Sequence, residues 1–293
     1  MGEINMDTLL GKVEKGKVID ENDDYYFVQL SDGNAYRLDK KEIKKPLKKG
    51  SFFTGFTYEN ADHDRQITRE TPRATAGKYG WGTVVKTRKD LGVFVDIGLP
   101  NKDIVISLDE LPTETSIWPH TNDRILVCLS VDKKERMWAH PADYDVFKAI
   151  SARADKTMIN KNVNATAFRL KMAGSLVLTD NFLLGFIHAS ERDREPRFGE
   201  QLNARVIGVH PDGTLNLSLK PRNYEALGDD AAMVLAMLQH IQDQTLPFND
   251  HSKPDAIKER FGISKGRFKM ALGHLLKAGV IQQTEDGIVL KEK

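Results

Sequence analysis

The sequence is poor in cysteine and in long apolar runs. Cys128 is the only cysteine among 293 residues, so a disulfide within the chain is excluded. Its place in the apolar run at 125–129 predicts a small core residue. No apolar run approaches the roughly 18 to 20 residues that cross a bilayer, and the N-terminal residues lack the basic-then-apolar order of a secretory signal. We therefore expect a cytoplasmic protein without a membrane partner.

Catalytic signatures are also missing. The chain has no glycine-rich loop ending in Lys-Ser/Thr, no His-Glu-x-x-His, no Cys-x-x-Cys and no Gly-x-Ser-x-Gly. Its eight histidines are dispersed, and the one cluster with metal-ligand character, residues 62–64, is better explained as a polar turn between strands. We expect no enzyme, no cofactor, no metal site and no small-molecule substrate.

Charge is nearly balanced. The formal net charge of +1 neither supports nor excludes a nucleic-acid partner. The lysine-rich run at 40–49 is best explained as the solvated side of a connection between strands. If it is functional, it would add a sequence-independent attraction for phosphates that weakens with salt.

The most informative stretch is residues 82–98, where strand residues alternate around a glycine turn. Related patterns recur at 184–191 and 212–219, and three cycles of short strands have similar length. Several short strands without helical periodicity favour small barrels over helical layers. In the first cycle the strand candidates are residues 16–19, 25–30, 35–38 and 51–58.

Helical patterns appear in the linker and in the last segment. Apolar spacing predicts a short helix at 144–153 and an amphipathic helix at 230–246. Ser252 and Ser264 are expected to cap two further helices, 253–261 and 265–277, and a hairpin at 280–290 ends the chain. Three helices followed by a hairpin are the order of a winged helix-turn-helix.

The predicted fold class is therefore mainly β with an α+β C-terminal domain: three tandem five-stranded OB-fold barrels and a winged helix. The expected divisions are a divergent barrel at 1–72, a second barrel at 73–142, a linker helix at 143–160, a third barrel at 161–224 and a winged-helix domain at 225–293.

The second cycle carries the residues best suited to bind a single nucleic-acid strand. Phe94 lies two residues after a glycine on a strand, and Asp132 and Arg136 flank the last hairpin turn. A stacked base needs an exposed ring and a phosphate needs a cation, so this arrangement offers both. Trp81, Lys86 and Arg88 belong to the same candidate face. The alternative is that both aromatic residues are core residues and the basic run is a solvated turn.

The second and third cycles resemble S1-type RNA-binding domains. The second retains Gly92, Phe94, Asp132 and Arg136 of the family pattern, but Leu91 replaces the first aromatic residue. The resemblance also implies RNA contacts by Phe186 and His188 of the third cycle, where Thr214 replaces the arginine. Each barrel keeps part of the usual surface, which favours a surface shared between barrels.

The complete order of domains resembles the bacterial conserved virulence factor B family. The resemblance rests on residues 102–105, 212–219 and 263–277. It implies binding of single-stranded RNA with low sequence specificity and post-transcriptional regulation without catalysis.

Two other functions remain open. A winged-helix regulator of transcription would use Lys265, Arg267 and Lys269 of the third helix on duplex DNA, although Glu285 and Asp286 occupy the wing turn. A scaffold that binds only proteins would instead need an exposed apolar patch.

Overall fold

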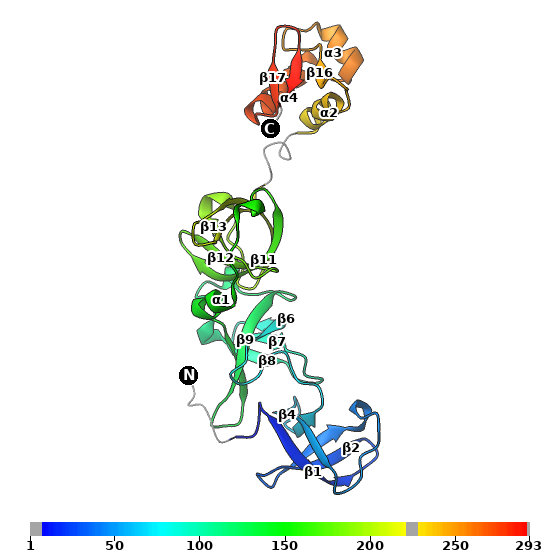
Figure 1. Cartoon of the computed structure of the whole chain (residues 1–293), viewed down its shortest axis with the longest axis vertical. Coiled ribbons are helices and arrows are strands. Elements are labelled where there is room, and N and C mark those ends of the chain that lie inside the picture. The colour runs from blue at the N-terminus through cyan, green and yellow to red at the C-terminus, as the bar shows by residue number, and fades with distance from the viewer. Residues whose placement is uncertain (1–7, 221–227, 292–293) are drawn as a thin grey trace. The chain divides into compact units, whose positions relative to one another are not determined.

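The computed structural model describes residues 8–220 and 228–291. The chain divides into two compact units, Met1–Leu219 and Lys220–Lys293. Closed β-barrels form the first unit, drawn from blue to yellow-green in Figure 1, and helices with a small sheet form the second. The fold class expected from the sequence is confirmed, whereas the proposed division between residues 224 and 225 lies outside the described residues.

Barrel 1 closes in the strand order β1-β2-β3-β5-β4. Its strands are β1 (Val13–Glu21), β2 (Tyr25–Gln29), β3 (Ala35–Asp39), β4 (Phe52–Glu59) and β5 (Arg65–Thr68). The sequence pattern predicts four of them but not β5. This strand is only four residues long and carries one strongly apolar residue, Ile67, so its alternation is too weak to recognise.

Barrels 2 and 3 repeat the same order of pairing. In each, the third and fifth strands pair in parallel and close the barrel, which is the OB-fold topology. Barrel 2 consists of β6 (Gly80–Arg88), β7 (Gly92–Asp96), β8 (Ile104–Ser107), β9 (Arg124–Val131) and β10 (Met137–Pro141). Barrel 3 consists of β11 (Asn162–Lys171), β12 (Gly174–Thr179), β13 (Leu184–His188), β14 (Gln201–Val209) and β15 (Leu215–Ser218).

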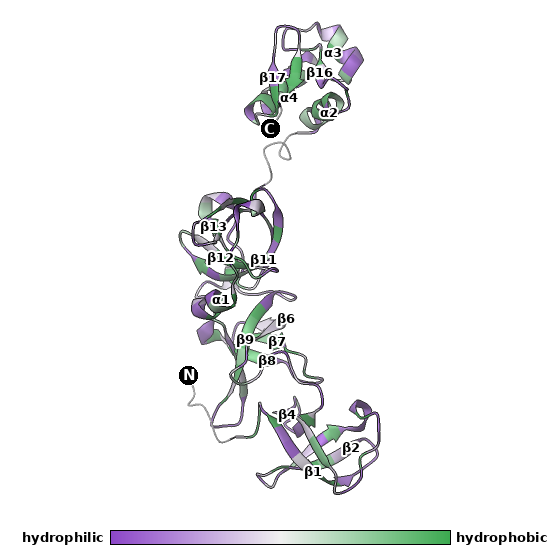
Figure 2. Ribbon diagram, in the orientation of Figure 1, coloured by the Kyte–Doolittle hydropathy of each residue, from purple (hydrophilic) through white to green (hydrophobic). Residues whose placement is uncertain are grey.

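Alternation along the strands decides which side chains fill the barrels, and most strands carry both green and purple stretches in Figure 2. Val93 and Val95 are fully buried in barrel 2, whereas Phe94 between them is half-buried and faces outward. Cys128 is also half-buried, because it lies on the outward side of β9 opposite His140 of β10. The expectation of a core cysteine was wrong.

Short helical segments connect the strands. Helix α1 (Tyr144–Ile150) links barrels 2 and 3, and the carboxylate of Asp143 caps it by accepting from the amide of Val146 at 3.0 Å. The 3₁₀ turns among the described residues are Lys40–Glu42, Leu108–Glu110, Thr115–Ile117, Lys156–Met158 and Ala189–Glu191.

Specific contacts join neighbouring barrels in the first unit. Between barrels 1 and 2, the amide of Asn101 lies 2.8 Å from the Tyr58 hydroxyl and 2.9 Å from Gln66. Between barrels 2 and 3, Arg197 donates two hydrogen bonds of 3.0 Å to the carboxylate of Asp123.

The second unit is a winged helix with a three-stranded sheet in the order β16-β18-β17. Its elements are α2 (Asp229–Gln239), β16 (Thr245–Leu246), α3 (Pro254–Phe261), α4 (Lys265–Lys277), β17 (Ile281–Gln283) and β18 (Ile288–Leu290). Ser264 caps α4 as expected, by accepting from the amide of Arg267.

Two local expectations for this unit were wrong. The helix expected at 230–246 ends at Gln239, because Leu246 is buried as a strand residue paired with Ile288. Ser252 does not cap α3: Lys253 stands at the cap position without a side-chain bond, and the Ser252 hydroxyl accepts from the amide of Asn249.

Candidate nucleic-acid interface

The outward side of barrel 2 brings two aromatic side chains from different strands close together. The pairing register places Phe94 of β7 opposite Val105 of β8, and Val105 opposite Trp138 of β10. Phe94, Val105 and Trp138 are half-buried, while Ile104, Ile106, Met137 and Ala139 beside them are buried. A row of two rings and one aliphatic side chain therefore crosses the sheet on its solvent side. With Lys86, Asp132 and Arg136, these residues are called the barrel-2 face.

A buried carboxylate fixes the cation at the end of this row. Arg136 donates to Asp132 from Nε at 2.8 Å and from Nη2 at 2.7 Å, and the indole N–H of Trp138 donates to the same oxygen at 3.1 Å. The guanidinium carbon of Arg136 lies 5.3 Å from the centre of the Trp138 ring. Asp132 is 8% exposed and Arg136 57% exposed at the side chain, so the cation is held from below and remains open to solvent.

Electrostatics keep Asp132 charged at neutral pH. Burial alone would raise its pKa, but hydrogen bonds from Arg136, from Trp138 and from the amide of Lys134 outweigh burial and lower the pKa to about 2. The turn itself requires a left-handed residue at Glu135, whose φ is 61°. The carboxylate is thus both a turn former and an anchor for Arg136.

The two basic residues predicted on β6 differ in their surroundings. Lys86 is exposed and lies opposite Phe94, because a bulge at Val85 shifts the register of β6 against β7. Arg88 makes a bidentate pair with Asp90, 3.1 Å from Nε and 2.6 Å from Nη2, which holds its guanidinium at the β6–β7 turn. Lys86 therefore adjoins the row of rings, whereas Arg88 is occupied in the β6–β7 turn.

Trp81 is not brought to the barrel-2 face. It lies opposite Leu126 of β9, its ring centre is 6.3 Å from that of Phe147 in α1, and the guanidinium carbon of Arg124 is 5.0 Å from its ring. Phe147 in turn stacks on Phe168 of barrel 3 at 3.8 Å. Trp81 thus packs at the junction of two barrels instead of beside Phe94.

Sequence reasoning missed Trp138 as a functional candidate. The available signal was the alternation of β10, in which buried Met137 and Ala139 flank Trp138 and direct it outward. Its role at the face depends on pairing with β8, a parallel contact between strands about thirty residues apart in the sequence, which no local pattern reveals.

Barrel 3 presents equivalent positions with different side chains. Phe186 of β13 lies opposite Leu176 of β12 and Asn216 of β15, and its ring centre is 6.3 Å from that of exposed His188. Arg169 lies opposite Leu176 just after a bulge, as Lys86 lies opposite Phe94. Phe186 and His188 therefore share one face, with Arg169 in the place of Lys86.

Barrel 1 also has an aromatic residue at the matching position, but its cation is compensated. Phe27 lies opposite Arg37, which lies opposite Gln66. The guanidinium of Arg37 is paired with the carboxylate of Asp64, and Asp20 stands across from Phe27 where barrel 2 has Lys86. This face is less suited to a phosphate backbone than those of barrels 2 and 3.

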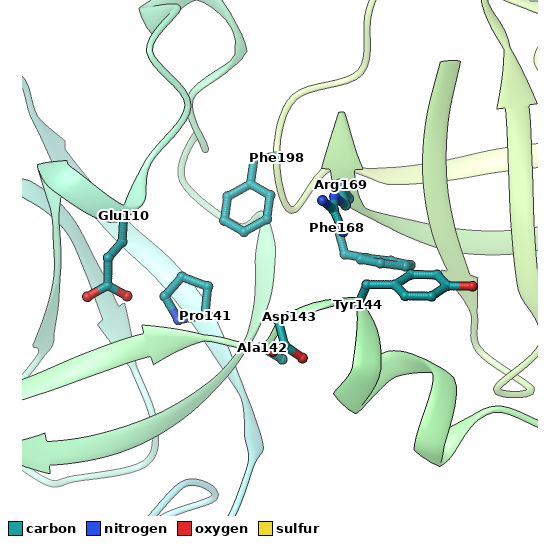
Figure 3. Close-up of a pocket in the computed structure, with 8 residues that line it drawn as sticks. All are labelled: Glu110, Pro141, Ala142, Asp143, Tyr144, Phe168, Arg169 and Phe198. Carbon is teal, nitrogen blue, oxygen red and sulfur yellow. The ribbon is translucent and has the colours of Figure 1, made fainter. Parts of the chain in front are cut away.

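A cleft of about 400 Å³ lies between barrels 2 and 3 (Figure 3). Glu110 and Pro141 come from the barrel-2 side, Tyr144 begins α1, and the ring of Phe198 lies above them. The lining residues are Glu110, Pro141, Ala142, Asp143, Tyr144, Phe168, Arg169 and Phe198. Arg169 belongs both to the cleft and to the outward side of barrel 3, so the cleft adjoins that face.

The basic side chains of α4 make contacts with other groups of the winged-helix domain. Arg267 donates to Asp230 of α2, with Nε 2.6 Å from Oδ2, and Lys269 lies 3.8 Å from Asp250. The ammonium of Lys265 reaches the carbonyl oxygen of His251 at 3.4 Å. All three residues proposed for nucleic-acid contact by α4 are thus engaged within the domain.

Within residues 8–220 and 228–291, no group of three or more His, Cys, Asp or Glu side chains is arranged to hold a metal ion. The helices of the same residues are all too short or too polar to traverse a bilayer.

The barrels, the aromatic and cationic face and the winged helix define a multidomain protein of the nucleic-acid-binding class. Family models match in chain order: an S1 domain at 10–70, the CvfB first S1-like domain at 79–140, the second domain of virulence regulatory factor CvfB at 147–221 and a CvfB-like winged helix domain at 232–290. The chain belongs to the conserved virulence factor B (CvfB) family.

Relatives match over nearly the whole chain. Conserved virulence factor B of Staphylococcus haemolyticus is 35% identical over 97% of this chain and 95% of its own length, and the uncharacterized protein YitL of Bacillus subtilis is 38% identical over 94% and 91%. A crystal structure of a multidomain protein with nucleic acid binding domains from Streptococcus pneumoniae is 46% identical, with a TM-score of 0.73 over 98% of this chain and 100% of that one.

Proposed function

We propose that this protein binds single-stranded RNA across the outward faces of barrels 2 and 3 and regulates gene expression after transcription. The observation that carries the proposal is the barrel-2 face, where Phe94 and Trp138 flank Val105 and exposed Arg136 is anchored by Asp132. Bases can stack on the rings. The anchored guanidinium can donate hydrogen bonds to a phosphate without losing much side-chain entropy on binding.

Magnitudes support this assignment. Stacking contributes roughly 1 to 3 kcal/mol per base, so two rings together with the cations Lys86 and Arg136 suffice for weak binding of a single strand. Stacking tolerates every base, and phosphate contacts carry no sequence information. The proposed binding is therefore weakly selective for sequence and sensitive to salt.

The third barrel extends the proposed path of the strand. Phe186, His188 and Arg169 offer a ring, an imidazole and a cation on the corresponding side of barrel 3. The cleft of Figure 3 adjoins Arg169 and is lined by Tyr144 and Phe198, which favours a strand that continues from one barrel to the next. Because each face alone is incomplete, affinity is expected to come from both.

The proposed mechanism is occupancy and involves no catalysis. The matched domains are S1-like and winged-helix domains, and none is named as an enzymatic domain. A bound strand would be withheld from other factors that read the same RNA, which changes its translation or decay. The description of the family, virulence regulatory factor CvfB, supports a regulatory role.

Duplex DNA binding by α4 is the alternative function. Its support is the absence of acidic residues between Ser264 and Lys277 on the helix that would enter a major groove. Against it, Arg267 and Lys269 are already paired with carboxylates of the same domain, and opening those pairs would weaken binding. A scaffold function without nucleic acid is the remaining alternative, and it predicts no binding to any of the probes below.

The test compares three probes of equal length: single-stranded RNA, single-stranded DNA and duplex DNA. Fluorescence anisotropy at about 50 and 200 mM salt would give the affinities of the wild type and of the Lys265→Ala/Arg267→Ala/Lys269→Ala variant. We expect single-stranded RNA to bind best and the variant to retain most of that affinity. Tightest binding of duplex DNA, lost in the helix variant alone, would replace this proposal with the transcription-factor alternative.

A further inference from the structure

Barrel 1 carries a second basic and aromatic surface on the wall formed by β1 and β4, which lie side by side in the blue barrel of Figure 1. The register places Lys17 opposite Phe52 and Lys15 opposite Thr54, so these side chains share the outward side of the ladder. Phe52 is 63% exposed, and the ammonium of Lys15 lies over its ring, 4.8 Å from the ring centre.

Further lysines come from the connection that precedes β4. The amide of Gly50 donates to the carbonyl of Val18 at 2.7 Å, and the amide of Val18 donates to the carbonyl of Ser51 at 2.8 Å. These bonds hold the connection against β1 and place Lys48 and Lys49 next to Phe52 along the chain. The β1–β4 face consists of Lys15, Lys17, Lys48, Lys49 and Phe52.

Carboxylates do little to compensate these charges. Asp20 lies 3.9 Å from the ammonium of Lys49, with both side chains more than 70% exposed, so their interaction is weak. Glu14 is on the same strand but opposite Gly55, one position out of phase with Lys15 and Lys17. The β1–β4 face is therefore a region of positive potential around one exposed ring.

This surface differs from the side of barrel 1 that corresponds to the barrel-2 face. In the closed order β1-β2-β3-β5-β4, the seam between β4 and β1 lies across the barrel from β3, which carries Arg37. On its other side β1 packs closely against β2: a Cβ added to Gly16 would lie 2.5 Å from the side chain of Leu30 and 2.6 Å from the carbonyl oxygen of Gln29.

We propose that the β1–β4 face is a second contact site for single-stranded RNA, with one base stacked on Phe52 and the adjoining phosphates held by Lys15 and Lys17. The inference rests on the proposed function for the class of ligand, but it uses none of the residues of barrels 2 and 3. An exposed ring between two cations matches the repeat of base and phosphate along a strand. A lipid surface would require a broader set of apolar anchors than one phenyl ring.

The proposed site predicts how the affinity depends on the length of the RNA. One OB barrel covers about 4 to 16 nucleotides, so a short oligonucleotide held by barrels 2 and 3 would not reach barrel 1. A strand of about 30 nucleotides would contact both sites, and the second contact then acts at high effective concentration. Loss of the β1–β4 face should weaken binding of long RNA and leave binding of short RNA unchanged.

The experiment measures anisotropy of RNAs of about 8 and 30 nucleotides with wild type, Phe52→Ala, Lys15→Ala/Lys17→Ala and the control Lys148→Ala/Lys258→Ala. The control removes the same charge from exposed lysines on α1 and α3. For the long RNA we expect about tenfold weaker binding by Phe52→Ala. The double lysine variant should also show a shallower dependence of log K on the logarithm of the salt concentration. The slope should be smaller by about 1.4, because each lost phosphate contact contributes about 0.7. Phe52→Tyr, which keeps the ring, should bind like wild type.

Failure of this site and failure of the main proposal give different results. If wild type binds neither RNA, the proposed function fails. If wild type binds both, and Phe52→Ala and the double lysine variant match the control on the long RNA, the β1–β4 face is not an RNA site. Binding to phosphatidylserine vesicles that depends on Lys15 and Lys17, without an effect on RNA, would overturn the assignment in favour of a lipid surface. Thermal unfolding of each variant confirms that the barrel is intact.

Discussion

Asp132 is the residue on which the geometry of the barrel-2 face depends. Its carboxylate receives Arg136 and the indole of Trp138, and it also accepts from the amides of Lys134 and Arg136 in the turn. A single acidic group thereby sets the direction of a cation and of an aromatic ring. This explains how an acidic residue can belong to a surface that we propose binds a polyanion: its carboxylate is covered, and its charge orients Arg136.

The low pKa of Asp132 predicts a specific dependence of stability on pH. The folded pKa of about 2 lies below the usual 3.8, so the group stabilises the fold above about pH 4, and this contribution is lost as the pH falls from about 4 to about 2. Because Arg136 is exposed and its interaction with Asp132 is screened by solvent, this contribution to the free energy of unfolding is about 1 to 2 kcal/mol. Urea unfolding at pH 5 and pH 3 should show a larger loss for wild type than for Asp132→Asn.

The control for this prediction is a distant acidic residue. Asp180→Asn, which removes an exposed carboxylate from barrel 3, is that control. Equal pH dependence in wild type and Asp132→Asn would show that the Arg136 anchor adds nothing to stability. RNA binding at pH 7 gives a second readout, since Asp132→Asn should weaken it several-fold by releasing Arg136.

Among the elements, the strand pair β7–β8 has little tolerance for added side-chain volume. Gly92 has φ of 129°, and a Cβ there would lie 2.0 Å from the carbonyl oxygen of Ile106. Gly92→Ala should therefore force β7 away from β8 and lower the free energy of unfolding of the first unit by about 2 kcal/mol or more. Chemical denaturation followed by tryptophan fluorescence would measure it.

Gly273 in α4 is the matched control. It is exposed, and nothing lies within 4 Å of an added Cβ, so Gly273→Ala should raise helix stability by about 0.5 to 1 kcal/mol. A neutral Gly92→Ala would mean that the β7–β8 ladder is looser than its geometry indicates.

Elements with strong alternation or clear caps could be predicted from the sequence. Strand β7 and helix α4 followed from the pattern of residues 92–97 and from Ser264. Strand β5 could not be predicted, because it is stabilised by pairing with distant β3. The end of α2 could not be predicted either, because Leu246 lies in a strand but also fits the apolar spacing of a helix. Local propensity is weaker than tertiary pairing in both cases.

At the scale of the whole molecule, barrels 2 and 3 are held together by a polar pair and an apolar cluster. Asp123 is 5% exposed and receives both the guanidinium of Arg197 and the amide of His120. Trp81, Phe147 and Phe168 form the apolar part of the same junction. The sequence could suggest Trp81 as an aromatic of interest, but its assignment to a junction depends on α1 and barrel 3, which no pattern within barrel 2 contains.

Arg197→Ala should weaken the contact between barrels 2 and 3 and destabilise the first unit. Loss of the guanidinium leaves the buried carboxylate of Asp123 with only the amide of His120, at a cost of about 3 kcal/mol or more. Differential scanning calorimetry should show a lower Tm for the first unit, with exposed Arg260→Ala of α3 as control. RNA spanning both barrels should bind more weakly, while RNA short enough for one barrel should not. An unchanged Tm would contradict a structural role for this pair.

The central claim is tested most directly by the affinity of single-stranded RNA for wild type and for Phe94→Ala/Arg136→Ala, measured by anisotropy at about 50 and 200 mM salt. The double variant removes one stacking ring and the anchored cation. We predict at least about tenfold weaker binding and a smaller salt slope, with Arg88→Ala, which lies opposite Gly92 at the β6–β7 turn and outside the barrel-2 face, close to wild type. Undiminished RNA binding by Phe94→Ala/Arg136→Ala would contradict the account.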